Sequence, residues 1–343
     1  MKKSIKLVAV LVALAMLALV AFTGCGNQPS GDNAEEPSTD APQAAALNIG
    51  VIQYISHPSL DNCYAGIKEA LETAYGENVN IDFQIGSDSS ADADCASYAK
   101  AMVAKNYDMI IAIATPAAIS AYAATEGTDI PVIFCSVSDP VAAKLVNTLD
   151  APGGNCTGTS DVLDLEDQLE LILTLQPEAK TVGILYTTSE VNSISNLEVF
   201  REVCAAKGVT VEASGVQSAS DIPAAANALA AKVDCINNFT DNNVVNNLSV
   251  VLDAAANAGI PVYGSEIEQV KNGCLGSVSI DYVAVGRMTG EMAAEVLNGA
   301  DITAMAVKTV SDSTPVINTE VLAALGIELP AALADAETVV TNK

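Results

Sequence analysis

Residues 49–54, Ile-Gly-Val-Ile-Gln-Tyr, reappear in similar form at residues 182–186 as Val-Gly-Ile-Leu-Tyr. Two further pairs follow in the same order, residues 108–115 with 233–240 and Ile130-Pro131-Val132 with Ile260-Pro261-Val262. The copies lie 133, 125 and 130 residues apart, so they are nearly in register. Any one pair would fit chance similarity between buried parallel strands, but three pairs in one order indicate an internal repeat.

Each copy of the first stretch is followed by a polar loop and a helical stretch. In residues 59–75, apolar side chains recur every three or four positions, which is typical of an amphipathic helix. Short β-branched runs alternate with such helices along the body, and this alternation predicts βαβ units with parallel strands. Together with the repeat, it predicts an α/β fold made of two similar lobes.

Turn-forming residues mark where the chain would pass between the lobes. Residues 150–155, Asp-Ala-Pro-Gly-Gly-Asn, are the most turn-rich stretch of the body, a second crossing is expected near Asp281, and the chain would return through residues 307–315. We therefore predict a first lobe from residues 47–153 plus 282–306 and a second from residues 154–281 plus 307–343. A body of about 300 residues exceeds the usual size of a single core, which agrees with two domains.

The N-terminus has the order of a signal peptide. Three lysines precede an unbroken apolar run at residues 7–22, which ends in Thr23-Gly24-Cys25, so we predict a signal peptide at residues 1–24. Cys25 resembles the cysteine of a bacterial lipobox, which is acylated and becomes the new N-terminus, although Phe22 stands where that pattern usually has Leu. The alternative is an uncleaved signal anchor that spans the membrane. Either anchor would hold the body outside the bacterial cell membrane.

The segment after Cys25 has the composition of a linker. Up to residue 46 it contains no apolar residue larger than Ala and is rich in Pro, Ser, Asn and acidic residues. Such a segment cannot bury enough apolar surface to offset its ordering entropy, so we predict a flexible tether at residues 25–46, anchored by lipid at Cys25.

The chain is strongly acidic. Its formal net charge is −27, and removing the first 24 residues, which carry three lysines and no acid, makes it −30. Such a charge repels nucleic acid and anionic lipid head groups, so a DNA-binding regulator is disfavoured and no nucleic-acid partner is expected.

The remaining seven cysteines are odd in number and mostly lie in apolar contexts, which favours buried free thiols over a disulfide framework. They form no Cys-x-x-Cys pair, and His57 is the only histidine of the sequence. A zinc site and a Cys-His or Ser-His dyad are therefore improbable, and we expect no catalytic residue, metal or cofactor.

Ligands of open parallel sheets bind beyond the carboxyl ends of the strands, where helix N-termini also present free amides. With two lobes facing each other, the expected site is the cleft between them. The candidate ligand-binding residues follow predicted strands: Tyr54, Thr115 and Ser136 in the first lobe, Asn192, Ser193 and Asp241 in the second, and Asp281 at the crossing.

Several of these residues have a purely structural alternative. Thr115 before Pro116 is a helix-start signal that needs no ligand. Asp241 would either face the cleft or stabilise a helix dipole, and Asp281 would either reach the cleft or hold the hinge in place. We interpret His57 primarily as a polar loop residue.

An ordered set of motifs resembles the tryptophan/tyrosine-type substrate-binding proteins of ABC transporters, from about Leu47 to Leu329. The set comprises residues 131–134, 138–142 and 152–158, Asn192-Ser193, Thr240-Asp241-Asn242, Asp281-Tyr282 and Gly286-Arg287-Met288-Thr289-Gly290. The resemblance implies a type I periplasmic-binding fold, in which two Rossmann-like lobes joined by a three-segment hinge close around one ligand. It also implies a monomer that serves an ABC permease and its ATPase.

The resemblance further implies an amino acid, often aromatic, as the ligand. Helix-start amides with Thr115, Asn192 and Ser193 would then take the carboxylate, and Asp241 and Asp281 the ammonium. The chain departs from the family at Asn196, where a Gln is common, and it has no Trp, so an aromatic ligand would pack on tyrosines such as Tyr54 or Tyr186.

Other functions remain open on the sequence alone. An α/β hydrolase is disfavoured because no Gly-x-Ser-x-Gly elbow, P-loop or His-based dyad is present. A ligand sensor for a membrane receptor would use the same lobe closure. Within the transport function, the ligand could instead be a branched-chain amino acid, a nucleoside or a sugar.

Overall fold

The first lobe is built on a six-stranded sheet with the order β11-β5-β4-β3-β1-β2. The structure, a computed structural model, describes residues 46–310 and 314–342, so the predicted signal peptide and Cys25 lie outside the described residues. The strands of this sheet are β1 (Leu47–Gln53), β2 (Val79–Ile85), β3 (Met109–Ile113), β4 (Val132–Cys135), β5 (Cys156–Ser160) and β11 (Lys308–Thr309). All of these pairs are parallel.

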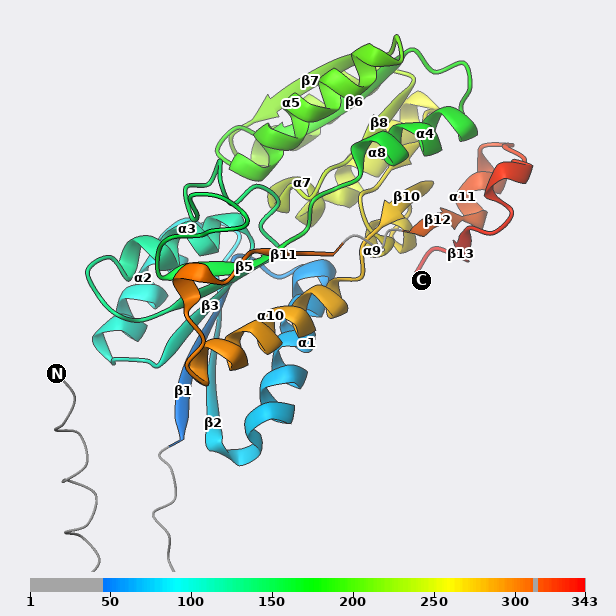
Figure 1. The fold of residues 1–343 in the computed structure, drawn as a ribbon. Coiled ribbons are helices and arrows are strands. Elements are labelled where there is room, and N and C mark those ends of the chain that lie inside the picture. The colour runs from blue at the N-terminus through cyan, green and yellow to red at the C-terminus, as the bar shows by residue number, and fades with distance from the viewer. Residues whose placement is uncertain (1–45, 311–313, 343) are drawn as a thin grey trace, which may run out of the picture. The chain divides into compact units, whose positions relative to one another are not determined.

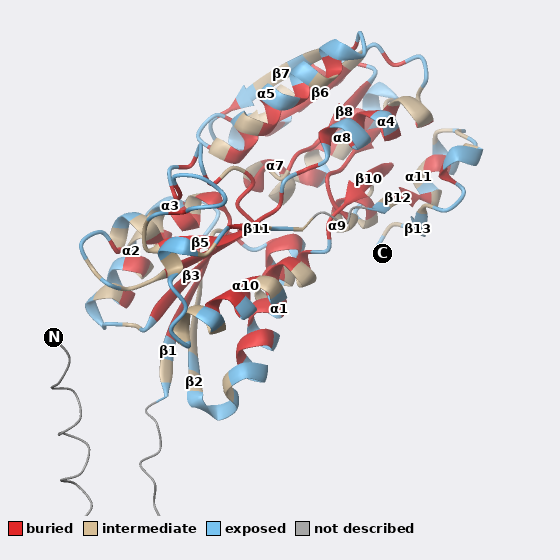
Figure 2. Ribbon diagram, in the orientation of Figure 1, coloured by how far each residue is buried: buried red, intermediate tan, exposed pale blue. Residues whose placement is uncertain are grey.

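Helices cover both faces of this sheet, because alternate side chains of each strand point to opposite faces. Ile49, Val51 and Ile111 belong to the same core as α1 (Pro58–Tyr75) and α10 (Tyr282–Leu297). Ile110 and Ala112 pack instead with α2 (Ala91–Ala104) and α3 (Thr115–Ala124). Buried residues therefore run along the central strands, and exposed ones lie on the outer helix faces (Figure 2).

The second lobe repeats this arrangement (Figure 1). Its parallel strands β6 (Thr181–Thr187), β7 (Thr210–Val216), β8 (Cys235–Asn237) and β9 (Val262–Tyr263) have the order β7-β6-β8-β9. A three-stranded sheet of β10 (Gly276–Ser279), β12 (Thr314–Asn318) and β13 (Glu337–Val339) continues it, since Leu275 donates to the carbonyl of Val262 and Gly264 to that of Gly276. Its helices are α4 (Leu165–Leu175), α5 (Val191–Ala206), α6 (Ile222–Ala230), α7 (Asn242–Asn246), α8 (Leu248–Ala258), α9 (Ile267–Lys271) and α11 (Thr319–Ala324).

The predicted internal repeat corresponds to equivalent strands of the two sheets. β1, β3 and β4 occupy the same places in the order β2-β1-β3-β4 as β6, β8 and β9 do in β7-β6-β8-β9. The α/β fold with two parallel-sheet lobes, predicted from this repeat, is confirmed. Short 3₁₀ turns at Gly76–Asn78, Ala219–Asp221, Ile302–Ala304 and Ala331–Leu333 complete the described elements.

Strand pairing moves two of the predicted lobe limits. β5 pairs with β4, so the chain leaves the first sheet after Ser160 and not at Gly153. β11 pairs with β5, so the return to the second lobe comes after Thr309 and not at residue 307. The turn-rich stretch at 150–155 is a loop within the first lobe, which leads into β5. With these two changes, the division into lobes remains a prediction.

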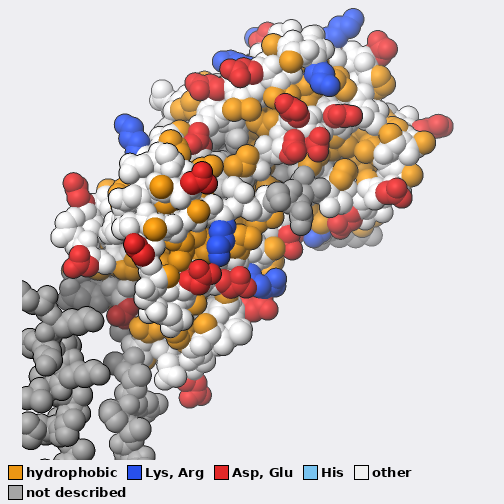
Figure 3. Space-filling view, viewed as in Figure 1, with side chains coloured by type: hydrophobic (Ala, Val, Ile, Leu, Met, Phe, Trp, Pro, Cys, Tyr) orange, Lys and Arg blue, Asp and Glu red, His pale blue; other side chains and the backbone are white. Residues whose placement is uncertain are grey.

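Three further findings concern the cysteines, the helices and the surface charge of the described residues. The seven cysteines after Cys25 are buried and free, as predicted. Within residues 46–310 and 314–342, no helix combines the length and the apolar character needed to cross a membrane. Acidic side chains outnumber basic ones on the face that Figure 3 shows, as the net charge of −27 requires.

Candidate functional site

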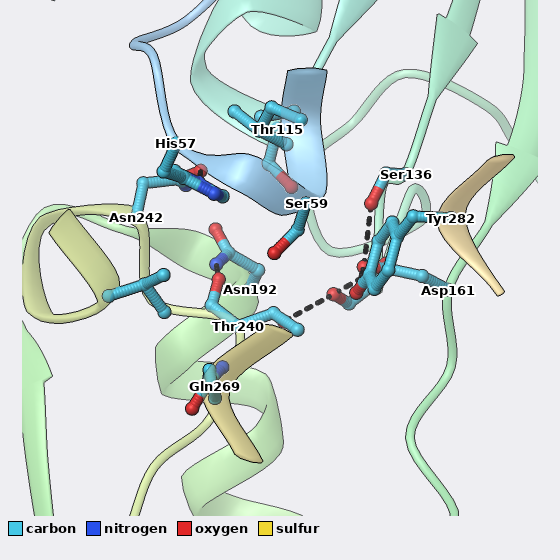
Figure 4. Close-up of a pocket in the computed structure, with 14 residues that line it drawn as sticks. His57, Ser59, Thr115, Ser136, Asp161, Asn192, Thr240, Asn242, Gln269 and Tyr282 are labelled. Atoms are coloured by element: carbon cyan, nitrogen blue, oxygen red, sulfur yellow. Dashed lines mark hydrogen bonds between the residues drawn. The ribbon is translucent and has the colours of Figure 1, made fainter. Parts of the chain in front are cut away.

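A cavity with an empty volume of about 330 Å³ lies between the two lobes (Figure 4). Its first-lobe residues are His57, Ser59, Leu60, Ala114, Thr115, Ser136, Ser138, Asp161 and Tyr282. Its second-lobe residues are Asn192, Thr240, Asn242, Val245 and Gln269. The lining side chains leave room for little more than one water molecule inside it.

The fold places these side chains at the carboxyl ends of parallel strands and at the starts of helices. His57 and Ser59 begin α1, Thr115 begins α3, and Asn192 lies in the first turn of α5. Ala114 and Ser136 also have φ values of 79° and 58°, which side chains with a Cβ rarely adopt. Backbone strain of this kind concentrates at functional sites, which supports the cavity as the site.

Among the residues that the structure describes, Asp161 is the one acid that lines the cavity, and it is 1% exposed. Its carboxylate accepts hydrogen bonds from the hydroxyls of Ser136 at 2.7 Å, Ser138 at 2.9 Å and Tyr282 at 2.8 Å. Burial raises the pKa of Asp161, and these three hydrogen bonds oppose the rise. No Lys or Arg is present among the described residues that line the cavity.

Asp241 and Ser193 lie behind the cavity, not in it. Asp241 is fully buried and accepts hydrogen bonds from the amide and hydroxyl of Thr187, the hydroxyl of Ser193 and the amide of Val244, at 2.6 to 2.9 Å. Both carboxylate oxygens are therefore occupied, and Asp241 is the N-cap of α7. The predicted contact of Asp241 with a ligand ammonium has no support in this geometry.

Asp281 and Tyr54 also lie outside the cavity. Asp281 is exposed and caps α10 by accepting from the amides of Val283 at 2.9 Å and Ala284 at 3.1 Å. Tyr54 lines a separate, wider groove that also includes Asp92 and Glu190. Of the seven predicted ligand-binding residues, the structure brings three together in the cavity, Thr115, Ser136 and Asn192.

A buried polar network in the second lobe lies next to the cavity. Glu190 accepts hydrogen bonds from the side chains of Asn192 and Asn242 at 3.1 and 2.7 Å and from the amides of Asn242 and Asn243. Burial raises the pKa of Glu190 to about 8, and the negative charge of Asp241 adds to this effect. The network holds the Asn192 and Asn242 side chains in place against the cavity.

Three hydrogen bonds connect the lobes directly around the cavity. The His57 imidazole lies 3.4 Å from the Asn242 side-chain oxygen, and the hydroxyls of Ser138 and Thr240 are 3.5 Å apart. Ser195 of α5 donates to Asp139 of the first lobe at 2.9 Å. The lobes are thus in contact on the ligand-facing side, which agrees with the small free volume of the cavity.

Sequence reasoning missed Asp161 and Gln269 and undervalued His57, which is buried and lines the cavity. Asp161 follows β5, whose sequence Cys-Thr-Gly-Thr-Ser contains few of the apolar residues that mark a buried strand. The signal that could have found it is the position of an acid directly after a strand that adjoins β4.

Comparisons with known proteins agree with this architecture. A family model described as ABC transporter substrate binding protein matches residues 48–340. The chain is also 37% identical, over 331 residues, to a curated protein named tyrosine-binding protein from Clostridioides difficile (strain R20291), with 96% of this chain and 94% of the relative covered.

Two solved structures are 36% identical in sequence to this chain. One is an ABC domain in complex with L-Trp from Streptococcus pneumonia, which covers 86% of this chain and 100% of its own, with a TM-score of 0.82. The other is the ligand-free, open structure of a substrate-binding protein with adhesive properties from Clostridium difficile, which covers 87% and 100%, with a TM-score of 0.66.

Proposed function

Because the chain belongs to the family of ABC transporter substrate-binding proteins, and is therefore a binding protein and not an enzyme, we propose that it captures an aromatic amino acid between its lobes and delivers it to an ABC permease. The observation that carries the proposal is a buried carboxylate, Asp161, which faces the cavity between the lobes, where the described lining residues include no Lys or Arg. The relatives named for tyrosine and for L-Trp support an aromatic side chain.

Asp161 would receive the ligand ammonium, because its partners differ from those of the other buried acids. Its carboxylate accepts from three side-chain hydroxyls, which can rotate away when a cation arrives. Asp241, Glu190 and Glu266 instead hold backbone amides, which cannot rotate away. An ammonium beside Asp161 would form charge-assisted hydrogen bonds and offset the cost of burying its charge.

The ligand carboxylate would bind where helix starts face the cavity. The first turns of α1 and α3 carry amides without intrahelical partners, and the hydroxyls of Ser59 and Thr115 lie beside them on the cavity wall. Helix N-termini bind anions through these amides and the helix dipole, so no Lys or Arg is required. Thr115 keeps the role predicted for it, whereas Asp161 replaces Asp241 and Asp281. The free side-chain atom of Asn192 is an acceptor and cannot bind the carboxylate.

The described lobes have the arrangement expected of a ligand-bound protein. At the same sequence identity of 36%, the structure fits the relative with bound L-Trp better than the ligand-free, open relative, with TM-scores of 0.82 and 0.66. The lobes are in direct contact around the cavity and leave little free space in it, so we propose opening and closing about the three inter-lobe segments.

The location of the protein follows from the same proposal. Substrate-binding proteins of ABC transporters work outside the cytoplasm, where the permease receives its ligand. We propose that Cys25 is acylated after removal of residues 1–24 and that residues 25–46 tether a monomeric body to the cell membrane. These residues precede the described part of the chain.

A thermal-shift screen of the purified chain against the amino acids, nucleosides and sugars tests this function. A ligand that binds only the folded state must raise its stability, by about 2.7 kcal/mol at a concentration of 100 Kd. The proposal predicts a shift with tyrosine or tryptophan. A shift with a sugar or nucleoside alone would mean that the ligand belongs to that class and is not an amino acid. Transport of the identified ligand is then measured separately, and transport that does not depend on this protein would favour a sensor for a membrane receptor.

A further inference from the structure

Three hydrogen-bond acceptors on the cavity wall have no partner in the part of the chain that the structure describes: the side-chain oxygen Oε1 of Gln269, and two that Figure 4 shows on the same side of Ser59. The latter two are the side-chain oxygen Oδ1 of Asn192 and the ring nitrogen Nδ1 of His57. Asn192 is 3% exposed and His57 is 8% exposed, so bulk water does not reach them freely. Buried polar atoms are nearly always paired in folded proteins, so these two require an explanation.

The neighbours of Asn192 fix the orientation of its amide. The nitrogen Nδ2 donates to a carboxylate oxygen of Glu190 at 3.1 Å and to the carbonyl of Thr240 at 3.0 Å. The carbonyl of Thr240 accepts hydrogen bonds only, so oxygen and nitrogen cannot exchange places. In Figure 4 the Asn192 side chain extends toward the space between His57 and Ser59.

The same reasoning fixes the tautomer of His57. Asn242 donates from Nδ2 to Glu190 at 2.7 Å, so its Oδ1 must accept the hydrogen bond from Nε2 of His57. Burial lowers the pKa of His57 to about 4, so the ring is neutral near pH 7. Because Nε2 carries the proton, Nδ1 is left with a free lone pair.

We propose that the ligand side chain carries a neutral hydrogen-bond donor, such as a phenol O–H or an indole N–H, and that Asn192 and His57 accept it. This inference rests on the proposed function. Figure 4 shows Asp161 with Ser136 and Tyr282 at one side of Ser59 and His57 with Asn192 at the other, so the ammonium and the donor occupy opposite ends. A ligand without the donor would leave two buried acceptors unpaired.

Calorimetric titration of the purified chain with L-tyrosine, L-tryptophan, L-phenylalanine and O-methyl-L-tyrosine tests the inference. All four carry the same ammonium and carboxylate, but the last two lack the donor. We expect phenylalanine and O-methyltyrosine to bind at least about tenfold more weakly than the better of the first two, which is the cost expected of unpaired buried acceptors.

Phenylalanine binding within about threefold of tyrosine and tryptophan would overturn the inference and leave the amino-acid function intact. Binding of none of the four would overturn the function itself. The four titrations use the unmodified chain, so their result does not depend on whether a variant folds.

A matched pair of variants on α5 locates the acceptor. Asn192→Ala should reduce the preference for tyrosine or tryptophan over phenylalanine to below about threefold, because the acceptor is lost while the ammonium site stays. Asn196→Ala removes a buried amide one turn further along, which also has an unpartnered atom but does not line the cavity. It should keep the preference of the unmodified chain, and an equal loss in both variants would contradict the assignment.

Discussion

At the scale of single residues, four buried acids differ in the hydrogen-bond donors that surround them. Asp161, Glu190, Asp241 and Glu266 are each at most 2% exposed. Glu190, Asp241 and Glu266 bind amides at the starts of α7 and α9, whereas Asp161 binds only hydroxyls and lines the cavity. Burial alone therefore does not distinguish these acids, but the kind of donor around each of them does.

Replacing Asp161 by Asn should weaken amino-acid binding at least about tenfold, or roughly 1.4 kcal/mol, because the ligand ammonium loses its charged partner. Asp281→Asn is the matched control, since Asp281 is exposed and only caps α10. Calorimetry on both variants gives the comparison. A greater loss of affinity in the Asp281 variant would restore the role that the sequence predicted for that residue.

The raised pKa of Glu190 predicts a stability that falls as the pH rises. Its pKa is about 8 in the folded chain and near 4.5 ordinarily, so at pH 5 to 8 the folded state keeps a proton that the unfolded state has lost. The free energy of unfolding should therefore decrease by on the order of 1 kcal/mol between pH 7 and pH 8, before the buried cysteines, whose pKa values are also raised, contribute at higher pH. His57 and Glu266, with pKa values of about 4 and 7, act mainly at lower pH.

Urea denaturation at several pH values from 7 to 8 measures this slope. Glu190→Gln should flatten it, whatever its effect on the absolute stability, because the titrating group is gone. A slope that is unchanged in Glu190→Gln would assign the pH dependence to another group.

The polar residues at helix starts could be predicted from the sequence, but the direction in which each side chain points could not. Thr115, Ser136 and Asn192 were found because they follow strands, and they line the cavity. Asp241 follows a strand in the same way, yet its carboxylate turns back onto the amides of its own helix start and of Thr187. Local spacing does not distinguish these two orientations, because both satisfy the same N-cap position.

At the scale of elements, α1 and α10 pack closely through glycines. A Cβ on Gly286 would collide with the backbone of Cys63, and one on Gly66 would collide with the backbone of Val283. Gly286 and Gly290 belong to the motif that resembles the substrate-binding family, and the structure explains both by helix contact. This contact holds α10, and with it Tyr282, beside Asp161.

Gly286→Ala should therefore destabilise the chain by about 1–3 kcal/mol, the usual cost of overpacking against a backbone that cannot move aside. Glu291→Ala on the exposed face of the same helix is the control and should stay within about 0.5 kcal/mol of the unmodified chain. Urea denaturation compares the two. Equal stability of Gly286→Ala and the control would mean that the helices can separate without cost.

The elements that the sequence predicted best are those with strong apolar patterns. β3 and β8 lie inside the predicted repeats, and β1 and β6 overlap them. β5 was missed because Thr and Ser fill a strand that is nevertheless fully buried, with Thr159 paired to Thr289 of α10 at 2.7 Å. Burial of such a strand depends on tertiary partners that no local pattern shows, and its pairing with β4 extends the first sheet past Gly153 to Ser160.

At the scale of the whole molecule, the two lobes meet across a cavity that both must line. Asn192 and Thr240 come from the second lobe and Asp161 and His57 from the first, so a bound ligand would touch both. The two-lobe fold followed from the repeat alone. Closure did not, because it depends on contacts between loops far apart in the sequence, such as Ser195 with Asp139.

A crystal structure of the chain with L-tyrosine or L-tryptophan tests the central claim most directly. We predict closed lobes, with the ligand ammonium within hydrogen-bond distance of Asp161 and the carboxylate at the starts of α1 and α3. A ligand bound outside this cavity, or one whose carboxylate and not its ammonium faces Asp161, would contradict the account.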